Sequence, residues 1–152
     1  MATFQKFNQF VEDLAKGVHN LSTGQLKVAL TNTAPVAANS VYADLTSPLA
    51  TTNLSGATPF NVTTTSCEQT SGTLTLVLVD LTLTATGAVG PFQYVVLYND
   101  TPSSPADPLI GFWDYGSAVT MASALGSPPA MVRSQGAEVP VGWWRCTAEP
   151  WT

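Results

Sequence analysis

Charged side chains are scarce in this sequence. They make up 10% of its 152 residues, whereas about 25% is typical of soluble proteins. The five basic residues are scattered and the net charge is −5. Because neutralising phosphates requires a basic patch, we expect no direct nucleic-acid ligand. A surface with so few charges must be made polar by Thr, Ser and Asn, or else be partly covered by partners.

Long apolar runs are also missing. No run reaches the ~18–20 residues that would span a bilayer, so we expect no membrane partner. The N-terminal stretch, MATFQKFNQFVEDLAKG, is amphipathic and carries acids. That pattern is typical of neither a secretory signal nor a transit peptide.

Catalytic groups are few. His19 is the only histidine, and Cys67 and Cys146 are the only cysteines. We interpret His19 as a surface residue or one that compensates the dipole of the preceding helix. We favour buried free thiols for the two cysteines, and a disulfide between them is the alternative. A zinc site lacks ligands, and no P-loop, nucleophile elbow or dinucleotide fingerprint occurs. The sequence therefore predicts a non-enzymatic protein without a cofactor or a metal.

The carboxylates allow three interpretations. Asp100, Asp107 and Asp114 lie on or beside a predicted central hairpin, and Asp80 lies on a neighbouring predicted strand. Two of them could act as acid and base on a sugar, or Asn99, Asp100 and Asp107 could hold calcium. Turn chemistry is favoured, because the Asn-Asp-Thr-Pro and Ala-Asp-Pro stretches are typical turn sequences.

The strands are the strongest signal. Two apolar, aromatic stretches within residues 91–116 carry apolar side chains on both faces at period two, which predicts a central strand pair. In the first strand, we expect one face to carry Phe92, Tyr94, Val96 and Tyr98 and the other to carry Val95 and Leu97. In the second strand, we expect one face to carry Leu109, Trp113 and Tyr115 and the other to carry Ile110 and Phe112.

Other strands are expected on either side of that pair. Residues 26–31 predict a half-buried strand. Residues 31–71 predict long surface loops with one or two short strands, the better one near residues 60–66. Residues 73–84 predict the strongest strand. In the strong strand we expect Val77, Val79, Leu81 and Leu83 to share one face, and we expect the first half of the strand to be covered on both faces. The predicted fold is mainly β, an antiparallel sandwich or jelly-roll-like barrel with one N-terminal α-helix.

We expect a single domain of a helix over residues 3–17, a β core over about 25–121 and a C-terminal arm over about 122–152. In the helix, Thr3 would cap the start and Gly17 would follow the end. Its apolar stripe consists of Phe4, Phe7, Phe10, Val11 and Leu14. This stripe packs either on the sheet of its own domain or on a neighbouring subunit.

The arm contains three of the four tryptophans, Trp143, Trp144 and Trp151. Such large apolar side chains dock inside the chain or form a subunit contact. Together with the helix stripe, they are the candidate protein-interaction residues.

Four stretches carry a resemblance: FQKFNQFVEDLAKGVHNL, LKVALTNTAPV, GPFQYVVLYNDT and PLIGFWDYGS. Together they resemble a family of small virion structural proteins of tailed bacteriophages, over roughly residues 3–119. The resemblance implies a capsid decoration, or cement, protein that binds the outside of the assembled head. Residues 122–152 depart from that family's pattern, which puts its closing strand in doubt.

The resemblance also implies partners and location. The major capsid protein would be the partner, the protein would be a homo-oligomer, and it would reside on the virion head after synthesis in the bacterial cytoplasm. One alternative is a tail or head–tail connector protein. Another is a carbohydrate-binding module for adhesion that stacks sugars on Trp113 and Tyr115.

Overall fold

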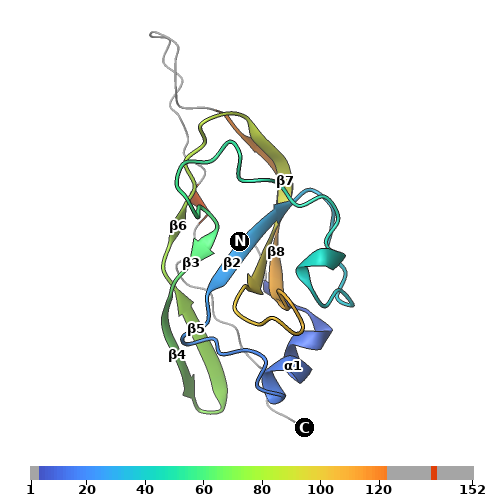
Figure 1. The fold of residues 1–152 in the computed structure, drawn as a ribbon, viewed down its shortest axis with the longest axis vertical. Coiled ribbons are helices and arrows are strands. Elements are labelled where there is room, and N and C mark those ends of the chain that lie inside the picture. Colours follow the sequence, from blue (N-terminus) through green and yellow to red (C-terminus); the bar gives the residue numbers. More distant parts are fainter. Residues whose placement is uncertain (1–3, 123–137, 140–152) are drawn as a thin grey trace.

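A computed structural model describes residues 4–122 and 138–139 of the chain (Figure 1). It is mainly β, with antiparallel sheets and one short N-terminal helix, which confirms the expected fold class. The elements in chain order are β1 (Phe4–Lys6), α1 (Asn8–Ala15), β2 (Leu26–Thr31), the 3-10 turn η1 (Tyr42–Asp44), β3 (Asn61–Val62), β4 (Thr64–Thr70), β5 (Thr73–Leu78), β6 (Leu81–Thr82), β7 (Val89–Asn99), β8 (Leu109–Met121) and β9 (Glu138–Val139). No helix in the described ranges has the length and apolar character needed to cross a membrane.

The main sheet has five strands in the order β1-β8-β7-β2-β3. The long β7–β8 hairpin therefore lies at its centre, as the doubly apolar strands predict. β2 is covered on both faces, because Val28, Ala29 and Thr31 are all at most 2% exposed. The expectation that this strand is only half-buried is wrong, since packed side chains lie above and below the sheet.

Two core clusters lie on the two faces of the main sheet. The larger joins Leu97, Ile110 and Trp113 of the sheet to Leu76 and Leu78 of β5. The β4–β5 hairpin thus forms a second layer, which Figure 1 shows as the green ribbon beside the sheet. The smaller cluster packs Phe7, Ala29, Leu45, Val96, Tyr98, Leu109 and Phe112 on the opposite face.

A bulge in β8 changes the expected faces of the central hairpin. Leu97 pairs with Gly111 while Tyr98 pairs with Leu109, which leaves Ile110 as an extra residue on β8. An extra residue shifts the alternation by one position. Ile110 and Trp113 consequently share one cluster, and Leu109 and Phe112 the other. The simple period-two assignment of this strand is wrong for that reason.

The N-terminal helix is shorter than expected and begins at Asn8. Phe4 belongs to β1 and pairs with Trp113, and the Phe7 N–H donates to the Ile110 carbonyl at 3.2 Å. Pairing with the edge of β8 satisfies this backbone, so tertiary contact overrides the helical periodicity. Thr3, the expected cap, lies outside the described residues. Gly17 does follow the helix end, with φ +73°.

The expected strand over residues 73–84 is divided into β5 and β6. Leu76 and Leu78 of β5 are each 4% exposed, whereas Val77 and Val79 are 36% and 50% exposed. The inward face is therefore the leucine face, and burial of the valine face was a wrong prediction. β5 pairs only with β4 among the described strands. The face that carries Leu76 and Leu78 covers the core, and Val77 lies on the opposite, more exposed face.

Candidate interaction surface

The aromatic stripe near the N-terminus is mostly core. Phe7 is fully buried, with its ring 5.2 Å from that of Phe112, and Phe10 is 4% exposed. These two side chains pack on their own domain and offer no surface to a partner. Phe4, Val11 and Leu14 are half-buried and keep an accessible part. For those three residues, partner contact stays a prediction.

The tryptophans of the expected arm, Trp143, Trp144 and Trp151, lie outside the described residues, as does Cys146. Cys67 is half-buried on β4, and burial raises the pKa of its thiol. The proposed contact role of the three tryptophans remains a sequence-based prediction.

Tyr115 is the most exposed large apolar side chain of the described residues, at 60%. It lies where β8 departs from regular pairing: Tyr94 pairs with Asp114 and Phe92 with Val119, so residues 115–118 have only Gln93 opposite them. Gly116 takes φ +87°, which a residue with a side chain rarely adopts. The chain therefore bulges outward and carries the tyrosine ring to the surface.

Asp114 holds this bulge in place. One oxygen, Oδ1, accepts from the Gly116 N–H at 2.7 Å and from Nε2 of Gln93 at 2.8 Å. The first bond closes the turn, and the second ties it to β7. Asp114 is thus a structural carboxylate, and it fixes the backbone on both sides of Tyr115.

Trp113 and Tyr115 do not form a common stacking platform. Trp113 is 4% exposed and its ring lies 5.0 Å from that of Phe4, inside the larger core cluster. A ring that binds a sugar must present a face to solvent. The adhesion alternative therefore loses one of the two residues on which it depended.

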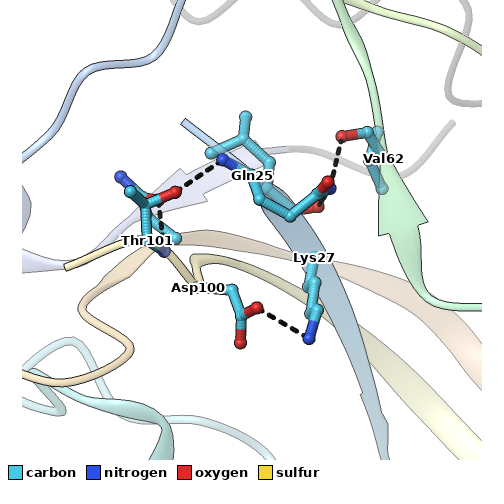
Figure 2. Close-up of polar contacts among 7 residues, drawn as sticks. Gln25, Lys27, Val62, Asp100 and Thr101 are labelled. Carbon is cyan, nitrogen blue, oxygen red and sulfur yellow. Dashed lines mark hydrogen bonds and ion pairs between the residues drawn. The ribbon is translucent and has the colours of Figure 1, made fainter. Parts of the chain in front are cut away.

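A network of polar contacts ties the turn of the β7–β8 hairpin to the start of β2 (Figure 2). The Gln25 N–H donates to Oγ1 of Thr101 at 2.7 Å, and Nζ of Lys27 lies 2.8 Å from Oδ2 of Asp100. Nε2 of Gln25 reaches the Val62 carbonyl at 3.4 Å. These contacts join β2, β3 and the hairpin turn, and they include an ion pair between the Asp100 carboxylate and the Lys27 ammonium group.

The calcium ligands considered above do not converge. Asn99 is 1% exposed, and its side chain is engaged by His19 and by the Thr101 N–H. Within the described ranges, no three His, Cys, Asp or Glu side chains are grouped closely enough to hold a metal ion. Asp107 lies near Asp100, and burial together with that negative charge raises the pKa of Asp107, against the effect of Lys27.

The space between β5 and the main sheet is a small apolar cavity of about 20 Å³. Phe10, Leu76, Leu97 and Trp113 are among the residues that line it. Pockets for small ligands measure about 300–1,000 Å³. This gap is a packing void and not a ligand site.

The sequence pattern places Tyr115, Val77 and Val79 on core strands, but all three side chains are exposed. The Asp-Tyr-Gly order was the available signal for Tyr115, because an Asp followed two residues later by Gly is typical of a turn. Nothing in the alternating apolar pattern of β5 indicates which face is covered. No family model, curated protein or solved structure matches the chain.

Proposed function

We propose that this protein is a non-enzymatic capsid decoration, or cement, protein of a tailed bacteriophage. It would bind the outside of the assembled head, as a homo-oligomer, and stabilise contacts between major capsid subunits. The observation that carries the proposal is where the resembling stretches lie. They fall on β1 with α1, on β2, on β7 and on β8, which are neighbours in the main sheet. The resemblance thus covers one contiguous structural unit and not scattered segments.

The architecture suits such a role. A doubly covered sheet gives a rigid scaffold, and a structural protein needs no ligand-sized cavity. A protein that binds the closed shell but not its open form stabilises the shell by RT ln(1 + [L]/Kd), about 3 kcal/mol at a hundredfold excess over Kd. Repeated over many sites, this modest free energy would reinforce a whole head.

Tyr115 is the contact residue that the described structure favours. Tyrosine is enriched among residues that dominate binding energy, and a rigidly held side chain loses little entropy on binding. Val77 and Val79 are exposed as well and form a second proposed apolar contact. Phe4, Val11 and Leu14, with Trp143, Trp144 and Trp151 of the arm, complete the proposed contact set.

The proposal is tested by adding the purified protein to heads that lack it. We expect saturable binding in many copies per head, and heads that retain their DNA to a higher temperature. Tyr115→Ala should lower the affinity about tenfold or more, as expected for a residue that dominates an interface. Ser117→Ala, an exposed neighbour on the same bulge, is the matched control and should bind normally.

Two outcomes would contradict the proposal. Absence of binding to heads would reject the capsid role. Recovery from virions in the few copies of a single ring would favour the tail or connector alternative.

A further inference from the structure

Three polar side chains are buried together where the segment after α1 meets the end of β7. His19 is 6% exposed, Asn99 is 1% exposed and Asp13 is 4% exposed. The sequence suggested a surface histidine, so this burial is a correction. Its cause is a long-range contact, because Asn99 and His19 are 80 positions apart in the chain.

The orientation of Asn99 is fixed by its other partner. The Thr101 N–H donates to Oδ1 of Asn99 at 3.1 Å. Nδ2 of Asn99 then faces Nδ1 of His19 at 3.4 Å. Since an amide NH₂ can only donate, Nδ1 must accept, and the neutral imidazole carries its proton on Nε2.

Two further described groups act on the imidazole, one carboxylate and one aromatic ring. Asp13 of α1 accepts from Nε2 of Gln9 at 3.0 Å through Oδ1, and its charge acts on His19. The Phe10 ring lies 5.2 Å from the imidazole ring. Oδ2 of Asp13 and Nε2 of His19 are buried without a hydrogen-bond partner among the described residues. Asp13 therefore favours a protonated histidine, while burial and the Asn99 donor oppose it.

We propose that His19 and Asn99 form an acid-sensitive latch that holds the segment after α1 against the end of β7. A proton on Nδ1 would place two donors face to face and put a charge into a buried site. Either effect breaks the contact, so the His19 side chain separates from Asn99 when it is protonated. This inference is independent of the proposed function.

The direction of the pH effect follows from burial. Burial lowers the pKa of His19 below its usual 6.5, more than the nearby Asp13 carboxylate raises it. The folded protein then binds fewer protons than the unfolded chain in that range. The latch contributes fully above about pH 6.5, and its contribution is lost as the pH falls through the folded pKa.

The test uses the fact that His19 is the only histidine. An NMR titration of the full chain gives a single imidazole curve, and we expect its midpoint below 6.5. The Asn99 side-chain amide signals should shift with the same midpoint, because Nδ2 of Asn99 faces Nδ1 of His19. An imidazole midpoint at or above 6.5, or unmoved Asn99 signals, would overturn the latch.

Two variants sharpen the test. Asn99→Asp replaces the donor facing Nδ1 with an acceptor, so it should raise the midpoint above that of the native chain. Asp13→Asn removes the favourable charge and should lower the midpoint further. Glu68→Gln, an exposed change on β4, is the control and should leave the midpoint unchanged. If Asn99→Asp does not fold, the native titration and Asp13→Asn still decide, and an unchanged midpoint in Asp13→Asn would reject the arrangement.

Discussion

The Phe4 ring occupies the space where residue 111 would carry a side chain. A Cβ built on Gly111 would overlap the ring and lie 2.8 Å from the Gln5 carbonyl oxygen. Gly111 pairs with Lys6 in the β1–β8 ladder, and it also follows the bulge at Ile110. The absence of a side chain here lets β1 close on β8 while Phe4 packs on Trp113.

The first prediction concerns this contact. Gly111→Ala should reduce the free energy of unfolding by about 1–3 kcal/mol, because the added methyl must displace a ring and a backbone oxygen. Urea unfolding followed by fluorescence measures the change. In combination with Phe4→Ala, the cost should be less than the sum of the single costs, since the overlap is relieved. Strict additivity would show that the two residues do not share this space.

The second prediction separates core from surface in the apolar stripe. Phe7→Ala should cost about 3–5 kcal/mol, because a fully buried ring is lost and a cavity remains. Val11→Ala, at a half-buried position of α1, should cost under about 1 kcal/mol. Chemical denaturation compares the two variants. Equal costs would contradict the assignment of Phe7 to the core.

The third prediction concerns Asp114 and the bulge that presents Tyr115. Asp114→Ala removes the acceptor of two hydrogen bonds and should cost about 1–3 kcal/mol. Asp114→Asn keeps one acceptor oxygen and should cost less. Chymotrypsin cleaves after tyrosine, so limited digestion at Tyr115 should be faster in Asp114→Ala than in the native protein. Unchanged cleavage would mean that Asp114 does not order the bulge.

The fourth prediction is a pH dependence at Asp107. Burial and the negative charge of Asp100 raise the pKa of Asp107, so the folded state favours its protonated form. Its stabilising contribution is present below the unfolded pKa of about 3.9 and is lost as the pH rises through the folded pKa. Asp107→Asn should therefore gain a few tenths of a kcal/mol at pH 7, the scale of partly exposed charges.

That gain should vanish near pH 3, where the native carboxyl is protonated as well. Urea midpoints at the two pH values measure the difference. Asp107 has φ +51°, a conformation that asparagine tolerates well. Asp107→Ala is the comparison, since it removes the charge but strains the backbone, and it should be less stable than Asp107→Asn at pH 7. A gain for Asp107→Asn that is equal at both pH values would rule out the charge as its cause.

The sequence predicts the centre of this fold better than its faces. Apolar side chains on both sides of residues 91–116 placed that hairpin in the middle of a sheet, where β7 and β8 are found. Because Ile110 is an extra residue in β8, Leu109 and Phe112 lie on the same face and not on opposite faces as the simple alternation predicts. A bulge depends on how two strands align, and the pattern of one strand does not contain that information.

The same limit explains the candidate surface. Val77 and Leu78 are similar in hydrophobicity, and only the position of the main sheet determines which of them is covered. His19 is buried against Asn99, which lies 80 positions away in the sequence, so the local sequence around His19 does not indicate its burial. Turn chemistry was predictable where it is local, as in the Asn-Asp-Thr-Pro stretch, where the Thr101 N–H donates to Oδ1 of Asn99 two positions earlier.

The place of β1 in the sheet has a consequence for folding. Its partner β8 is the last strand of the main sheet to be synthesised, so residues 4–6 leave the ribosome long before residues 111–113 exist. Pairings between such distant segments form slowly, because the chain must close a large loop before any contact rewards it. The buried Phe7 and the half-buried Phe4 therefore stay without this cover until β8 has been synthesised.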